Sequence, residues 1–250
     1  MQRNYKIDRI KGICILFVVV THFNWSDKQR DLLLFPFWIE MAVPVFMIIT
    51  GYVFSMSFDN KGCNTLKKIY DLKYTFRRLL RYLIPYFVIF SIELFIYYSF
   101  SYKISIPYSI MVFITGGLGP GAYYVPILIQ ITFFMPLIYL LLQNNPLIGI
   151  FLCFALNLLY EVVKTLINMP DSIYRLCAFR YLFILAFGAF LYFYKRDIKK
   201  HVIMIIGAIG GGISYLYGIY RKPTCLFGKL DRHMLCGLSI CMSIVISGFE

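Results

Sequence analysis

Long apolar segments separated by short polar connections dominate this sequence and restrict what it can fold into. An α-helix needs about 20 apolar residues to cross the hydrocarbon core of a bilayer, which is about 30 Å thick. Eight segments approach or exceed that length: residues 10–25, 32–58, 82–102, 122–143, 146–167, 176–194, 202–220 and 234–249. Because backbone amides inside a bilayer must be satisfied within the segment, such runs predict helices. We therefore expect an all-α fold, a polytopic transmembrane helical bundle of about 8–9 spans.

One further apolar segment, residues 105–118, has an ambiguous length. Its 14 residues would extend about 21 Å as a helix, about 9 Å less than the hydrocarbon core. It is therefore either a ninth span or a re-entrant segment, and the distribution of basic residues between loops does not decide between the two. The glycine-rich stretch after it, residues 116–121, breaks any helix and lacks the Gly-Lys-Ser/Thr of a phosphate-binding P-loop.

Basic residues outnumber acidic residues by 25 to 12, which gives a net charge of +13. In a chain with 60% hydrophobic residues, this charge favours a lipid bilayer over nucleic acid as the partner. Residues 59–81 carry seven basic and two acidic residues and are expected to be cytoplasmic. Basic residues also precede the first apolar segment, and no small-x-small cleavage site follows it. We expect a signal-anchor helix in a multi-pass plasma-membrane protein with a cytoplasmic N-terminus.

The seven cysteines form no Cys-x-x-Cys pair, and most lie inside apolar segments, where cysteine acts as a small hydrophobe. We therefore predict neither a disulfide framework nor a metal site, and no bound cofactor. The sequence contains no internal repeat and no low-complexity linker that would divide it. We expect a single membrane domain over residues 1–250.

The first apolar segment, residues 10–25, contains His22 where its neighbours are hydrocarbon. In one helix, Lys11 and His22 would lie within roughly 20° of one face and about 16 Å apart along the axis, with Asp8 near the same face. An ionisable residue inside a span is a functional hypothesis by default, although His22 could also pack as a satisfied polar residue against another helix. Glu40 would lie at a similar depth as a partner for His22, or would simply reach water at the outer interface.

Other polar and small residues in the spans have mainly structural interpretations. Glu161 and Lys164 are three residues apart in one predicted helix and are expected to pair with each other. The Gly-x-x-x-Gly pattern at 207–211 favours close helix packing. Glu93 lies near the middle of the third predicted span, residues 82–102.

Four stretches taken together resemble the integral-membrane acyltransferase 3 family, which O-acylates cell-surface sugars. IDRIKGICILFVVVTHF resembles the first-helix Arg-x10-His signature, with His22 at the histidine and Lys11 where an arginine is usual. AVPVFMIITGYVFS resembles the Phe-rich stretch with Ser-Gly in the family's second helix. RRLLRYLIPYF resembles the Arg-x-x-Arg run that leads into a Pro-containing third helix. GPGAYYVPILIQ resembles the stretch with Gly-Pro and aromatic residues found midway along the family's sequences. The order and spacing of these stretches within the first 130 residues are specific. The chain is shorter at its C-terminal end than is usual for the family.

The resemblance implies an acyl-CoA donor, usually acetyl-CoA, reached from the cytoplasm, and a sugar hydroxyl as the acceptor. The only histidine within a predicted span, His22, is the expected general base for the hydroxyl proton, with Glu40 as its carboxylate partner. The expected donor-binding residues are cations at the cytoplasmic end: Lys11, Arg78 and Arg81. The expected acceptor path is lined by Tyr123, Tyr124 and Gln130. Plainer explanations are positive-inside topology for the arginines and interfacial anchoring for the tyrosines.

A non-enzymatic transporter or flippase of a lipid-linked sugar is the alternative class. It would also use buried ionisable residues and glycine breaks, but it should show an inverted repeat of broken helices. The sequence contains one such break, at residues 116–121, which favours the enzyme. A structural membrane subunit would tolerate the loss of His22.

Overall fold

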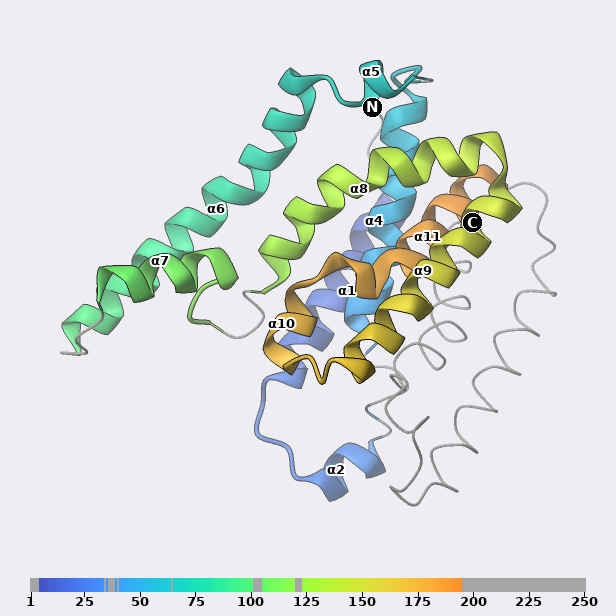
Figure 1. Ribbon diagram of the computed structural model, residues 1–250. Coiled ribbons are helices and arrows are strands. Elements are labelled where there is room, and N and C mark those ends of the chain that lie inside the picture. Colours follow the sequence, from blue (N-terminus) through green and yellow to red (C-terminus); the bar gives the residue numbers. More distant parts are fainter. Residues whose placement is uncertain are drawn as a thin grey trace. The chain divides into compact units, whose positions relative to one another are not determined.

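The computed structural model describes residues 5–194 except 34, 36–38, 40, 64, 101–104 and 120–122, and every regular element in this part is helical (Figure 1). The helices are α1 (Tyr5–Thr21), α2 (Asp27–Leu32), α4 (Ala42–Asp59), α5 (Leu66–Ile69), α6 (Leu72–Ser99), α7 (Ile106–Thr115), α8 (Tyr124–Asn144), α9 (Pro146–Leu166), α10 (Asp171–Leu176), the 3-10 turn η1 (Ala178–Tyr181) and α11 (Leu182–Tyr194). The predicted all-α class is confirmed for these residues.

Four of the described helices, α4, α6, α8 and α9, are long and apolar enough to cross a membrane. The predicted spans at 202–220 and 234–249 lie outside the described residues, and so does the glycine pattern at 207–211. The total of eight or nine spans therefore stays a prediction. The predicted second span, residues 32–58, is wrong as one helix, because α2 ends at Leu32 and α4 begins only at Ala42.

Helix α6 begins ten residues earlier than the predicted third span. The Asp71 side chain accepts a hydrogen bond from the backbone N–H of Lys73 at 3.2 Å and caps the first turn. The 28 residues of α6 extend about 42 Å, so its first turns reach beyond a hydrocarbon core of about 30 Å. The basic residues that the sequence assigned to a loop, Arg78 and Arg81 among them, therefore lie on a helix.

The ambiguous segment 105–118 forms a helix that is too short to cross a bilayer. Helix α7 has 10 residues, which extend about 15 Å. It ends where Gly116 adopts a left-handed conformation, with φ of 116°. Tyr86 of α6 donates a hydrogen bond to the carbonyl oxygen of Phe113 at 2.5 Å, and their rings lie 5.0 Å apart. Helix α7 thus packs beside α6, as Figure 1 shows.

The described residues form two compact units, residues 5–55 with 184–194 and residues 56–183. Within the first unit, α4 and α11 approach closely at glycines. A Cβ atom at Gly51 would collide with the carbonyl of Leu185, and one at Gly188 with the carbonyl of Ile48. These glycines allow the two backbones to touch.

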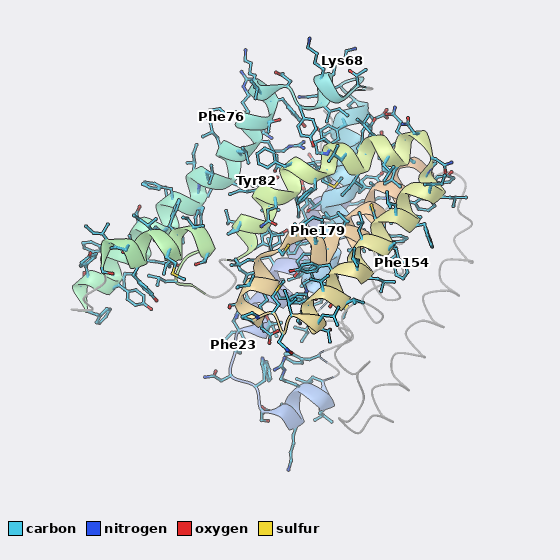
Figure 2. All side chains as sticks on the ribbon, viewed as in Figure 1. Phe23, Lys68, Phe76, Tyr82, Phe154 and Phe179 are labelled. Carbon is cyan, nitrogen blue, oxygen red and sulfur yellow. The ribbon has the colours of Figure 1, made fainter. Side chains whose placement is uncertain are left out.

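The second unit is built around α8, which contacts α5, α6, α9, α10 and η1. The face of α8 that carries Ile127, Ile131 and Met135 is completely buried. Phe179 of η1 lies 5.1 Å from the ring of Phe134 and 6.0 Å from that of Tyr160, so it joins α8 to α9 (Figure 2).

Candidate functional site

His22 is exposed and lies in the turn directly after α1. The prediction that His22 is buried within the first helix is wrong, because the last carbonyls of α1 are satisfied locally. His22 donates its backbone N–H to Val19 at 3.1 Å, and the indole N–H of Trp25 bonds the carbonyl of Val20 at 2.8 Å. The helix therefore ends before the histidine, whose side chain is exposed.

Lys11 is half-buried on α1, at the border of the face that the helix buries. That face carries Ile7 and Cys14, which are four residues before and three after Lys11. Asp8 is also half-buried. Glu40, the predicted carboxylate partner of His22, lies outside the described residues, so this pairing stays a prediction.

The turn after α4 brings a lysine to the start of α6. The backbone N–H of Cys63 bonds Phe58 at 3.1 Å and that of Gly62 bonds Asp59 at 2.8 Å, with Gly62 at φ of 60°. This is a Schellman motif, in which glycine takes the left-handed position that reverses the chain. The reversal places the ammonium of Lys61 over the ring of Tyr74, 3.1 Å from its centroid.

Arg78 is half-buried and contacts the same ring from the next turn of α6. Its Cζ lies 4.7 Å from the centroid of Tyr74 and 5.4 Å from that of Phe58. Its Nη2 donates to the hydroxyl of Tyr74 and, at 3.3 Å, to that of Ser57, and these two hydroxyls lie 2.8 Å apart. We call Ser57, Lys61, Tyr74 and Arg78 the Tyr74 cluster.

Sequence reasoning found only one member of the Tyr74 cluster, Arg78. Lys61 was one of many basic residues in a predicted loop, and nothing in the spacing indicated Ser57 or Tyr74. Lys61 is exposed, yet desolvation lowers the pKa of its ammonium below its ordinary value; the charge of Arg78 acts in the same direction, whereas Cys63 and Asp71 act against it. Arg81, the second arginine of the family signature, is exposed.

The predicted acceptor path divides into two parts. Tyr123 and Tyr124 are half-buried at the start of α8, beside the glycine-rich break. Gln130 instead bonds the backbone with both ends of its amide, donating to Leu176 at 2.6 Å and accepting from Ala178 at 3.0 Å. Its side chain therefore fixes the connection between α10 and η1, and its assignment to the acceptor path stays a prediction.

Glu93 of α6 holds the glycine-rich break. Its Oε2 accepts the backbone N–H of Leu118 at 3.1 Å, and a Cβ atom at Gly119 would lie 2.5 Å from its Oε1. Gly117 adopts φ of 97°, a conformation that favours glycine.

A second tyrosine with two cations lies between α9 and η1. The Tyr174 ring lies 3.6 Å from the ammonium of Lys164 and 4.9 Å from Cζ of Arg180. Its hydroxyl donates to the buried Glu161 carboxylate at 2.5 Å, and Lys164 pairs with Asp171 at 3.4 Å. The expected pairing of Glu161 with Lys164 is thus replaced by these contacts. We call this group the Tyr174 cluster.

The fold and the site together define a helical membrane protein with a basic cluster at one end of a long span and an exposed histidine after its first helix. Residues 4–248 match the acyltransferase 3 family, described as an acyltransferase domain, and the chain belongs to that family. The resemblance inferred from the four sequence stretches is confirmed. The chain is therefore a multi-pass membrane acyltransferase. No curated protein and no solved structure shows a significant match to it.

Proposed function

We propose that this acyltransferase moves an acyl group, in the simplest case acetyl, from acyl-CoA to a hydroxyl of a cell-surface or lipid-linked sugar. The observation that carries the proposal is the family match over residues 4–248, which gives the reaction class. Acyl-CoA is a co-substrate here, and no bound cofactor takes part. The proposed location is the plasma membrane, with the N-terminus and the basic end of α6 on the cytoplasmic side.

His22 is the proposed general base. A neutral imidazole takes the proton of the acceptor hydroxyl as its oxygen attacks the thioester carbonyl. The new C–O bond forms, the C–S bond breaks, and the CoA sulfur leaves and takes up a proton. The exposed position of His22 after α1 supports this role, because the described side chains do not bury its ring. In this proposal Glu40 orients the imidazole and stabilises its protonated form.

The proposed donor site consists of Lys11, Arg78 and Arg81. CoA carries several phosphate oxygens, and cationic side chains bind these through charge-assisted hydrogen bonds. Tyr123, Tyr124 and Gln130 remain the proposed residues of the acceptor path. The position of the two tyrosines at the start of α8 supports this, because the adjacent glycines carry no side chain that would keep a substrate from the backbone.

The test uses the purified protein in phosphatidylcholine nanodiscs with acetyl-CoA, and free CoA is quantified by chromatography. We expect acetyl-CoA turnover in the wild type and a loss of at least about a hundredfold in His22→Ala. The matched controls are His201→Ala and His233→Ala, the same change at the other two histidines of the chain. Near-normal turnover in His22→Ala would disprove the mechanism. Absence of turnover by the wild type, with unchanged O-acyl esters on envelope polysaccharides after deletion of the gene, would disprove the function.

A further inference from the structure

Two cations share one aromatic ring in the Tyr74 cluster. The ammonium of Lys61 and Cζ of Arg78 lie 3.1 Å and 4.7 Å from the centroid of Tyr74. The two charges are therefore within about 8 Å of each other, no more than the Debye length at physiological ionic strength. They repel each other at this separation, and a bound anion would remove that repulsion.

Ring faces and hydroxyls orient the two cations, and the charge of Asp71 acts to raise the pKa of Lys61. Tyr74 offers a ring face to both cations, and its hydroxyl and that of Ser57 accept from one nitrogen of Arg78. The ring of Phe58 lies 5.4 Å from the guanidinium and 5.3 Å from the ring of Tyr139. Aromatic faces and hydroxyls orient a guanidinium through cation–π contacts and hydrogen bonds.

The surrounding segment adds to the positive charge. Residues 59–81 contain seven basic and two acidic residues, and Lys67, Lys68, Lys73, Arg77 and Arg81 are all exposed. Figure 2 shows Lys68 projecting away from the helices at the α5 end. A concentrated positive field of this kind attracts and retains a multiply charged anion. Phosphate fits best, because guanidinium and ammonium groups bind its oxygens through short, charge-assisted bonds.

We propose that Tyr74 is a positioning residue that holds Lys61 and Arg78 together as a phosphate-binding site. This inference rests on the proposed function, in which Arg78 binds the phosphates of CoA. It adds Lys61 to the donor site, and in it the hydroxyls of Tyr74 and Ser57 orient the guanidinium of Arg78. A phospholipid headgroup carries the same chemistry and is the second possible source of the phosphate.

The test compares the affinity for CoA of the wild type and Tyr74→Phe in phosphatidylcholine nanodiscs, by calorimetric titration. Tyr74→Phe keeps the ring under Lys61 and removes the hydroxyl bonds to Ser57 and Arg78. We expect its Kd for CoA and its KM for acetyl-CoA to rise at least fivefold, with kcat nearly unchanged and a weaker dependence of Kd on salt. Lys61→Met is expected to raise Kd to a similar extent.

Matched controls separate positioning from general damage. Tyr70→Phe removes a tyrosine hydroxyl that donates a hydrogen bond to the backbone carbonyl of Phe133 at 2.5 Å. Lys68→Met removes an exposed positive charge from the same segment. Both are expected to retain the wild-type Kd within twofold. An equal loss of affinity in Tyr74→Phe and Tyr70→Phe would overturn the proposal, because it would indicate a structural effect.

The remaining outcomes distinguish the inference from the function on which it rests. If Arg78→Ala weakens CoA binding and Tyr74→Phe does not, the positioning role is wrong while the donor site stands. If neither variant changes CoA binding, both the inference and the donor-binding role of Arg78 are wrong for CoA. If, in addition, phosphatidylglycerol copurifies with the wild type but not with either variant, the phosphate site is confirmed and the lipid headgroup supplies the phosphate.

Discussion

The Tyr74 and Tyr174 clusters are built on the same arrangement, a tyrosine ring that contacts one lysine and one arginine. They differ in what surrounds the cations. In the Tyr174 cluster the hydroxyl bonds the carboxylate of Glu161, and Lys164 pairs with Asp171. In the Tyr74 cluster the guanidinium of Arg78 bonds hydroxyls and contacts aromatic rings, and the charge of Asp71 acts to raise the pKa of Lys61. From this difference we expect the Tyr174 cluster, whose side chains bond carboxylates, to stabilise the fold, and the Tyr74 cluster to serve the acyl donor.

Burial follows the same division. Tyr174 is 3% exposed and stacks on Tyr160 with ring centroids 5.6 Å apart, whereas Tyr74 is only half-buried. A buried charge that loses its partner is expensive, while a cation near the surface remains solvated. Stability is therefore expected to depend on the Tyr174 cluster, and donor affinity on the Tyr74 cluster.

The largest expected effect is on stability and comes from Glu161→Ala. This change removes the buried carboxylate and leaves the hydroxyl of Tyr174 without its acceptor. We expect the free energy of unfolding to fall by about 3 kcal/mol, the cost of breaking a buried polar pair. Denaturant-induced unfolding in detergent measures it. The KM for acetyl-CoA of the protein that remains folded is expected to be unchanged, and a raised KM would break the comparison.

The next effect is expected from Ser57→Asp, which places a carboxylate in the position where the Ser57 hydroxyl now bonds Arg78. The new side chain would lie beside Nη2 of Arg78, which is 3.3 Å from Oγ of Ser57 in the wild type. We expect KM for acetyl-CoA to rise about tenfold, because an internal carboxylate competes with phosphate for the cation. The melting temperature is expected to stay the same or rise. Ser57→Asn is the uncharged control, and an equal KM in both variants would contradict the argument.

Arg78→Ala and Arg81→Ala sharpen the comparison within one helix. Both are expected to raise KM for acetyl-CoA and to change its dependence on salt, since each loses a phosphate contact. We expect the larger increase, about fivefold to tenfold, in Arg78→Ala, because its guanidinium is oriented by Tyr74 and Ser57. Arg81 is exposed and is expected to contribute about twofold to threefold, the effect of a solvated charge. Steady-state kinetics at two salt concentrations measure the KM of both variants. A KM equal to that of the wild type in both would refute the expected order.

The smallest effect is expected from Lys11→Arg, outside both clusters. Arginine is the usual family residue at this place, and it keeps the charge while adding a planar, bidentate fork. We expect KM for acetyl-CoA to stay within about twofold of the wild type or to fall. Lys11→Met, which removes the charge from a similar side chain, is the matched comparison. A large loss of activity in Lys11→Arg would show that this position needs the compact ammonium.

The helical class and the family could be predicted from the sequence because both depend on patterns that are local in the chain. Hydropathy identified the long apolar runs, and four short stretches carried the family resemblance. The start of α6 was missed, because a run of basic residues is typical of a loop and the cap at Asp71 lies inside that run.

The contacts of the candidate site could not be predicted, because they join residues whose separation follows no helical period. Lys61 reaches Tyr74 only through the reversal at Gly62, and Tyr174 reaches Glu161 only through the turn between α9 and α10. Gln130 bonds backbone groups 46 and 48 residues further along the chain. The end of α1 before His22 depends on the indole of Trp25, a contact that no pattern of apolar residues indicates.

The bond between Glu93 and Leu118 has a consequence for the order in which the protein assembles. It closes a loop of only 25 residues within the pair α6 and α7, and Tyr86 closes a similar one by bonding Phe113. Contacts between residues close in sequence form faster than distant ones. A helix of 10 residues is too short to be inserted on its own, and a carboxylate in hydrocarbon needs a donor. We therefore expect α6 and α7 to enter the bilayer as one hairpin during synthesis, before α8 is added.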